Sequence, residues 1–169
     1  MNGITTHQLI RWSKVLMVLF AGLFGAMVVL GNISDYATNF EFVRHTLLMD
    51  SLSSGSSLAW RALEPTWVHH GVYVLIICLQ ATFTALCLLG AWHLKREVAS
   101  SSQCFNHAKR YAIAGLMVGV FLWYLCFQVI AGEWFAMWQS EEWNALDTSD
   151  RFMNYILAAL IFVSLRAHD

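Results

Sequence analysis

Four apolar runs separated by polar stretches dominate the chain, at positions 15–31, 72–92, 111–131 and 152–165. At the rise of about 1.5 Å per helical residue, the second and third runs would be about 30 Å long, which matches the hydrocarbon thickness of a bilayer. They therefore predict membrane-spanning helices. The first run has a basic flank but no small-residue cleavage site, so we expect it to be retained as an anchor and not removed as a signal peptide.

The fourth run would extend only about 21 Å as a helix. Asp147 or Thr148 could cap this helix and start it earlier, and Arg151 and Arg166 can reach outward from its two ends. The pattern as a whole predicts an all-α protein, a four-helix transmembrane bundle made by a single domain over 1–169. We expect the spans at about 12–31, 66–93, 110–131 and 149–166.

Two connections, 32–65 and 132–148, are expected to form outer loops that contain short amphipathic helices. In the first loop, Thr38 and Glu41 have the spacing of a capping box. A serine-rich linker at 51–57 and a helical turn near 59–63 follow, and Pro65 suits the first position of the next helix. Five tryptophans are expected to form an aromatic belt at the outer membrane interface: Trp60, Trp67, Trp134, Trp138 and Trp143.

Lysine and arginine are distributed unevenly between the two sides of this arrangement. Seven of the ten lie at the N-terminus, in or beside the linker 94–109, and at the C-terminus, whereas nine of the eleven acidic residues lie on the loop side. The positive-inside rule then predicts that both termini and the linker 94–109 face the cytoplasm.

Composition supports a membrane protein and excludes several other classes. The chain is 58% hydrophobic and only 12% charged, and its net charge of −1 provides no basic footprint for nucleic acid. A soluble domain carries about 25% charged residues. The four cysteines have no CxxC spacing, so we expect neither a structural disulfide nor a zinc site.

The apolar runs contain no Asp, Glu, Lys or Arg, groups that ion-coupled transporters place in the membrane. We therefore do not expect this chain to transport ions or solutes alone. Gly115 and Gly119 form a GxxxG pattern in the third run, and Gly22 and Ala26 form a similar small face in the first. Such faces allow close helix packing, either within the chain or with a partner.

Polar side chains that could carry chemistry are concentrated in the outer loops and at their borders. Carboxylates and imidazoles can bind metals or exchange protons, but the more economical interpretation is a network that pins the two loops together, with Asp35 or Glu133 paired to Arg61. The candidate outer polar cluster consists of Asp35, Asn39, His45, Asp50, Arg61, His69, His70 and Glu133.

No spacing in the chain assigns a catalytic residue or a metal ligand. His69 and His70 are adjacent, so on a helix they point about 100° apart and do not simply share one ion. No histidine lies in the middle of a span, which argues against a di-haem cytochrome. We predict no cofactor, although a bound lipid or quinone is compatible with the loops.

The two loops carry paired motifs that resemble a known family. The motifs are Asn32, Asp35-Tyr36, Asn39-Phe40, Phe42-Val43, His45, Met49-Asp50 and Trp60-Arg61 in the first loop, and Glu133-Trp134-Phe135, Met137-Trp138-Gln139-Ser140 and Trp143-Asn144 in the second. The chain resembles the bacterial predicted small integral membrane proteins grouped as domain of unknown function 2165. The resemblance implies a four-span protein of the bacterial inner membrane. It implies no activity, substrate or cofactor.

Two functions of different classes follow. The sequence favours a non-catalytic, accessory or scaffolding subunit that binds a larger membrane complex or itself, through its outer loops or helix faces. The alternative is an outer-facing binding module or enzyme that holds a lipid-soluble ligand, a quinone or a lipid, in a polar loop pocket. In both cases the expected surroundings are the lipid bilayer and another membrane protein or a second copy, and not nucleic acid.

Overall fold

The protein is all-helical, as predicted. The computed structural model describes residues 5–52 and 56–167, and within these ranges it contains helices and turns but no strand. Part of the serine-rich linker at 51–57 lies outside the described residues.

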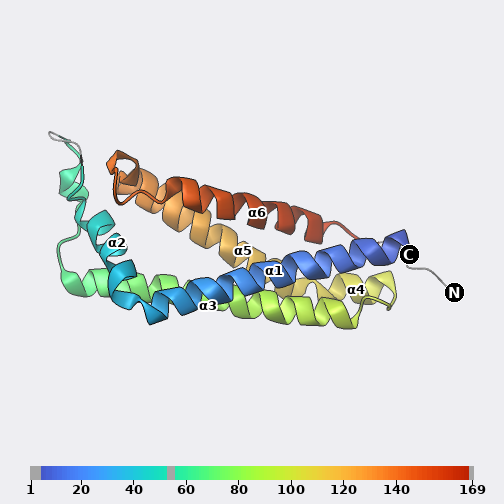
Figure 1. Ribbon diagram of the computed structural model, residues 1–169. Helices are drawn as coiled ribbons and strands as arrows, with labels where there is room; N and C mark the ends of the chain where they lie inside the picture. The colour runs from blue at the N-terminus through green and yellow to red at the C-terminus, as the bar shows by residue number, and fades with distance from the viewer. Residues whose placement is uncertain (1–4, 53–55, 168–169) are drawn as a thin grey trace.

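Three helices are long and apolar enough to cross a membrane. α1 (Thr6–Ser34) has 29 residues, α3 (Thr66–Arg96) has 31, and the helical stretch Ser102–Trp134 has 33. α6 (Leu146–Ser164) has 19 residues, but three charged side chains occupy its first two turns, so its apolar part is shorter than the others. α1 and α3 run antiparallel, and α6 lies along the third stretch (Figure 1).

The third stretch is not a uniform helix. It consists of α4 (Ser102–Ala108), α5 (Arg110–Val120) and the π-helix η2 (Phe121–Trp134). At the end of η2 the Phe135 N–H donates to the Ile130 carbonyl at 3.0 Å, a contact across five positions that is typical of a π-helix. The apolar pattern of the sequence predicted the span but neither its change of helix type nor the helix α4 in the linker.

In the first outer loop, a helix follows α1 almost directly. Asp35 alone separates α1 from α2 (Tyr36–Leu48). The predicted capping box of Thr38 and Glu41 was wrong, because the helix starts before both residues. α2 ends at Leu48, and the next residue, Met49, has a positive φ of 52° that turns the chain away from the helix axis.

Other predicted boundaries differ in how well they agree: α1 begins six residues before the predicted start at 12, and the third stretch begins eight residues before 110. The helical turn expected near 59–63 is η1 (Ala59–Arg61), and Pro65 lies one position before the first residue of α3. A second short turn, η3 (Met137–Gln139), lies in the other loop.

α6 starts earlier than predicted. Its first residue is Leu146, whose N–H donates to Asn144 Oδ1 at 3.1 Å. Asp147 and Thr148, the predicted caps, therefore lie inside the first turn, where Asp147 still interacts favourably with the helix dipole.

Small residues set the distance between α1 and α3. A Cβ atom placed on Gly22 would lie 2.8 Å from the Leu88 side chain, and one on Gly25 would lie 2.8 Å from the ring of Phe83. The predicted pair was Gly22 and Ala26, but Ala26 is only half-buried. The face is therefore used within the chain, and Gly25 contributes more to it than Ala26.

In the contact between α3 and α5 the glycines face backbone atoms of the other helix. A Cβ atom on Gly90 would lie 2.4 Å from the backbone nitrogen of Ala112, and one on Gly115 would lie 2.9 Å from the backbone nitrogen of Cys87. Gly119 faces the ring of Phe83 in the same way. The GxxxG pattern thus packs inside the molecule, which resolves the alternative that the sequence left open.

α3 and the third stretch separate beyond this contact. α5 packs along α3, whereas η2 makes far fewer contacts with it and packs on α6 instead. In Figure 1 the orange stretch that follows α5, which is η2, and the helix α6 accordingly lie away from α3 at the end of the molecule that carries α2. α2 packs over α3 at this end and contributes Phe40, Val43 and Leu47 to a small core with Phe135.

Buried cations hold the opposite, basic end together. The side chains of Lys14 and Lys109 both donate to the carbonyl of Leu165, at 2.5 and 2.7 Å, just beyond the last residue of α6. Arg11 donates to the carbonyl of Val98 at 3.1 Å. All three cationic side chains are buried. Cations are favourable here because the last carbonyls of a helix lack helical partners.

The glycine contact provides a direct test of this packing. Gly90→Ala places a methyl group against the backbone of α5, so we expect the free energy of unfolding to fall by about 1–3 kcal/mol. The matched control is Gly71→Ala in the same helix, where an added Cβ meets nothing within 4 Å. Ala has the higher helix propensity, so this control should be neutral or stabilising. Thermal unfolding in detergent measures both, and equal melting temperatures would contradict the close α3–α5 contact.

Candidate functional site

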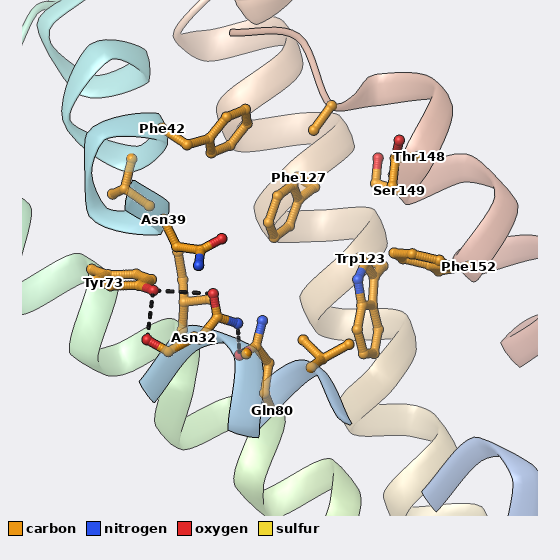
Figure 2. Close-up of a pocket in the computed structure, with 15 residues that line it drawn as sticks. Asn32, Asn39, Phe42, Tyr73, Gln80, Trp123, Phe127, Thr148, Ser149 and Phe152 are labelled. Atoms are coloured by element: carbon orange, nitrogen blue, oxygen red, sulfur yellow. Dashed lines mark hydrogen bonds between the residues drawn. The ribbon is translucent and has the colours of Figure 1, made fainter. Parts of the chain in front are cut away.

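A cavity of about 350 Å³ lies between two groups of helices, at the end where η2 separates from α3. α1, α2 and α3 line one side, and η2 and the start of α6 line the other (Figure 2). The first side contributes the polar groups of Asn32, Asn39, Tyr73 and Gln80. The second side contributes the rings of Trp123, Phe127 and Phe152 and the hydroxyl groups of Thr148 and Ser149.

A chain of hydrogen bonds runs through the polar side of the cavity. The Tyr73 hydroxyl donates to Asn32 Oδ1 at 3.0 Å, and it also lies 3.1 Å from the backbone carbonyl of Asn32. Asn32 Nδ2 in turn donates to Gln80 Oε1 at 2.9 Å. The chain connects α3 to α1 and back to α3, so it fixes the orientation of the Gln80 amide.

The last group in this series of hydrogen bonds is the Gln80 amide, whose Nε2 is a hydrogen-bond donor. Gln80 is only 4% exposed, and its Nε2 has no acceptor in the part of the chain that the structure describes. Figure 2 shows this nitrogen directed into the cavity. This nitrogen remains accessible from the cavity, so it can donate to an acceptor placed there. The cavity is therefore shaped to receive a hydrogen-bond acceptor.

The lining of the cavity carries no charge. None of its fifteen residues is Asp, Glu, Lys, Arg or His, and Tyr73 is the only titratable one. Asn39 donates from Nδ2 to the backbone carbonyl of Asp35 at 2.9 Å. A ligand here would meet neutral polar groups on one side and aromatic faces on the other.

A second cavity, of about 240 Å³, lies beside the first and shares four of its lining residues: Phe42, Val43, Ile76 and Phe127. Its other lining residues come from α2, α3, η2 and the outer loops, and they are apolar except for Thr46, whose hydroxyl donates to the Phe42 carbonyl. The two cavities therefore adjoin at these four residues, and only the first has several polar groups in its lining.

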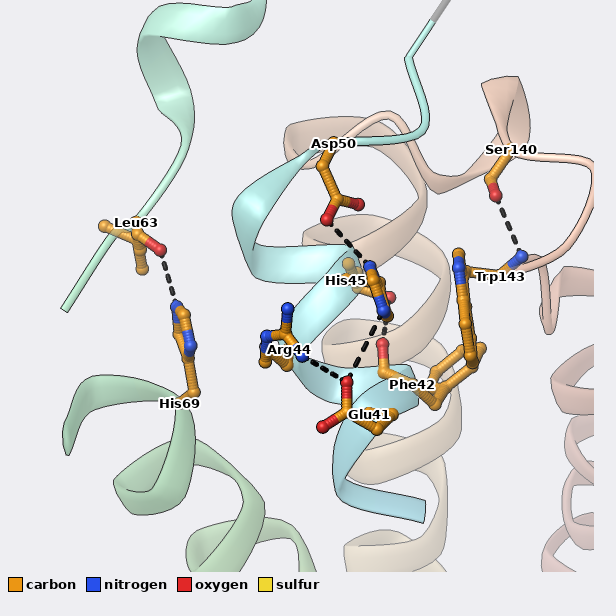
Figure 3. Close-up of polar contacts among 10 residues, drawn as sticks. Glu41, Phe42, Arg44, His45, Asp50, Leu63, His69, Ser140 and Trp143 are labelled. Atoms are coloured by element: carbon orange, nitrogen blue, oxygen red, sulfur yellow. Dashed lines mark hydrogen bonds and ion pairs between the residues drawn. The ribbon is translucent and has the colours of Figure 1, made fainter. Parts of the chain in front are cut away.

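The predicted outer cluster does not converge on the cavity. His45 Nδ1 lies 2.7 Å from Asp50 Oδ2, and His45 Nε2 lies 3.5 Å from Glu41, which also accepts from Arg44 (Figure 3). The imidazole of His45 stacks on Trp143, with 4.4 Å between the ring centroids and 11° between the planes. This group of residues joins α2 to the second outer loop.

The two adjacent histidines point to different partners, as the helical geometry predicted. His69 is buried and donates from Nε2 to the Leu63 carbonyl at 2.6 Å. His70 stacks on Phe40, with 4.0 Å between the ring centroids, and its Nδ1 lies 2.9 Å from the Tyr36 hydroxyl. Both histidines fasten the first loop to α3.

Arg61 joins the two outer loops, but not through a carboxylate. Its Nη1 donates to the backbone carbonyl of Trp134 at 3.1 Å and lies 3.4 Å from that of Glu133. Its guanidinium also lies 4.7 Å from the centroid of the Trp134 ring, a cation–π contact. The carboxylates of Asp35 and Glu133, the predicted partners of Arg61, are exposed.

The predicted cluster thus divides into local contacts, and of its members only Asn39 lines the cavity. Sequence reasoning missed Asn32, Tyr73 and Gln80 as a group. The available signal was that Asn32 belongs to the loop motif and that Gln80 is one of few strongly polar groups in an apolar run. Their proximity depends on how α1 and α3 align, which the sequence does not reveal.

The tryptophans of the predicted belt occupy two environments. Trp60, Trp67, Trp134 and Trp138 expose large parts of their rings, up to 77% for Trp67. Trp143 is half-buried against His45. Within the described ranges, no three His, Cys, Asp or Glu side chains are grouped so that they could hold a metal ion.

Comparison with known proteins gives one match. A family model described as "Predicted small integral membrane protein (DUF2165)" matches residues 10–166. No curated protein and no solved structure matches the chain.

Substitution of Arg61 and of Glu133 tests whether the loops are joined through backbone carbonyls or through a carboxylate. Arg61→Gln removes the hydrogen bond that the partly exposed, charged guanidinium donates. We therefore expect the free energy of unfolding to fall by about 1 kcal/mol. Glu133→Gln should have almost no effect, because Glu133 contributes its backbone carbonyl. Arg151→Gln is the control, since that guanidinium contacts Thr148 in its own helix. A loss in Glu133→Gln as large as in Arg61→Gln would restore the carboxylate pair.

Proposed function

The chain belongs to the predicted small integral membrane proteins of family DUF2165, and on this premise we propose that it is a non-catalytic, four-span protein that binds a lipid-soluble ligand in its outer cavity. The observation that carries the proposal is the buried Gln80 amide, which directs an unpaired N–H into a cavity of about 350 Å³. Cavities of about 300–1,000 Å³ with few, well-placed polar groups are typical of small-molecule sites.

α6 serves as the fourth span in this proposal. It packs along η2 and α5, and the carbonyl that follows its last turn meets Lys14 and Lys109 at the basic end. It therefore runs beside these helices to the basic end, with its charged first turns at the level of the outer loops. The protein is multi-pass, it lies in the inner membrane of a bacterium, and both termini face the cytoplasm, in keeping with the positive-inside rule.

A binding role fits the cavity better than catalysis. The one titratable lining group is the hydroxyl of Tyr73, which is engaged with Asn32. General acid–base catalysis needs a group that exchanges a proton near the working pH. The lining instead supplies neutral amides, hydroxyl groups and aromatic faces, which orient a ligand without reacting with it.

An accessory role is the second candidate function, and a different surface supports it. Trp60, Trp67 and Trp138 expose large areas at the outer end of the molecule, and tryptophan is enriched at protein interfaces. A larger membrane complex or a second copy of the chain could bind this surface. The small-residue faces do not support this role, because they are packed inside the molecule.

Purification tests the ligand-binding proposal. The wild-type protein, isolated in mild detergent, should retain a lipid-soluble compound that mass spectrometry of an organic extract identifies. Val28→Phe adds a ring to the cavity lining and should reduce the retained amount about tenfold, equivalent to about 1.4 kcal/mol of binding free energy. The matched control is Val74→Phe, on the exposed side of α3. Equal extracts from all three proteins would reject the site, and a co-purifying protein that Trp67→Ala releases would favour the accessory role.

Cysteine labelling tests the orientation. In a background that carries Cys104→Ser, the variants Ser57→Cys and Gln103→Cys each place an exposed thiol at one end of the molecule. A membrane-impermeant reagent applied outside intact cells should modify the thiol at position 57 and not that at position 103, because thiols in the cytoplasm are protected. The reverse pattern would invert the proposed topology.

A further inference from the structure

We propose that the ligand is a quinone, a planar uncharged ring that carries carbonyl groups and a hydrocarbon tail, and that one of its carbonyl oxygens accepts the hydrogen bond from Gln80 Nε2. This inference rests on the ligand-binding function proposed above and names the chemical class of the ligand. Four features of the cavity support it: its neutral lining, its depth in the membrane, its aromatic walls and the adjoining apolar cavity.

The neutral lining excludes a charged head group. An anionic phospholipid or a fatty acid needs a cationic partner when it is removed from water. No Lys, Arg or His lines the cavity, and the buried cations Arg11, Lys14 and Lys109 lie at the other end of the molecule, where they donate to backbone carbonyls. The cavity offers a donor without a charge, which suits a carbonyl oxygen.

The depth of Gln80 favours a head group that is itself soluble in hydrocarbon. Gln80 precedes Lys95, a cation at the basic end of α3, by fifteen positions, or about 22 Å along the helix. With Lys95 at the membrane boundary, Gln80 lies inside a hydrocarbon layer about 30 Å thick. Phospholipid head groups lie outside this layer, whereas a quinone ring partitions into it.

Aromatic rings and the second cavity suit the remaining parts of a quinone. Trp123, Phe127 and Phe152 line the cavity opposite Gln80 (Figure 2), and flat ligand rings pack well against such faces. The second cavity, which adjoins the first and shares Phe42 and Phe127 with it, is lined almost entirely by apolar residues. This lining suits the first part of an isoprenoid or alkyl tail.

The hydrogen-bond chain strengthens the contact with a carbonyl. Tyr73 donates to Asn32, and Asn32 donates to Gln80, so each bond polarises the next and the final N–H becomes a better donor. Only binding is inferred, and no electron transfer is part of the proposal.

The test is a titration of the purified full-length protein, in phosphatidylcholine nanodiscs, with decylubiquinone. Wild type should bind it saturably, with quenching of tryptophan fluorescence. Gln80→Leu should weaken binding about tenfold, the equivalent of one hydrogen bond of about 1.4 kcal/mol. Thr82→Val is the matched control, because its hydroxyl bonds only to the Cys78 carbonyl of its own helix. Equal affinities of Gln80→Leu and wild type would overturn the assignment of the donor.

A second variant keeps the test decisive if Gln80→Leu does not fold. Trp123→Phe keeps an aromatic wall but removes the indole nearest the ring, so quinone-dependent quenching should fall while quinone retention persists. Unchanged quenching would overturn the ring position. Dioleoylglycerol separates the two proposals: if it binds in a manner sensitive to Val28→Phe while decylubiquinone does not bind, the quinone inference fails and ligand binding stands. If neither binds, both fail.

Discussion

The close approach of α3 and α5 at Gly90 sets the geometry of the whole molecule. Here two backbones meet with no side chain between them, and the buried lysines at the same end attach α6 to both of its neighbours. Two helices that are in close contact at one end, and that have larger side chains between them at the other end, must diverge. In lipid, where the hydrophobic effect does little to draw helices together, such packing and polar contacts determine the arrangement.

The divergence creates the space that the rest of the structure uses. η2 leaves α3 as a π-helix, a form that is often found at functional sites, and it presents Trp123 and Phe127 to the cavity. α2 closes the outer end of the gap. The contacts of His45 with Trp143 and of Arg61 with Trp134 hold the two outer loops over it. The outer polar groups therefore join the two loops to each other and to the helices, and the cavity lies below them.

The sequence predicted the features that depend on local patterns, such as the long helices. It did not predict contacts between residues that are far apart in the sequence. The apolar runs located the long helices, although α1 and the third stretch begin six and eight residues before the predicted starts. The different partners of His69 and His70 followed from helical geometry. Glycine spacing identified close-packed faces but not their partners. The π-helix left no periodic signal in a run as uniformly apolar as 121–134. The pairing of Arg61 failed because backbone carbonyls, which every residue possesses, can replace a carboxylate. Gln80 was visible as a polar residue, but its role depends on Asn32 and Tyr73, which reach it only after α1 and α3 align.

The buried lysines have a consequence for biogenesis. Lys14 and Lys109 both donate to the carbonyl of Leu165, which is synthesised after both of them. While the first three helices enter the membrane, these two ammonium groups are available to lipid phosphates and can help to anchor the nascent chain. Once α6 arrives, they become internal ligands of its terminus. A chain interrupted before α6 would retain two ammonium groups without their final acceptor.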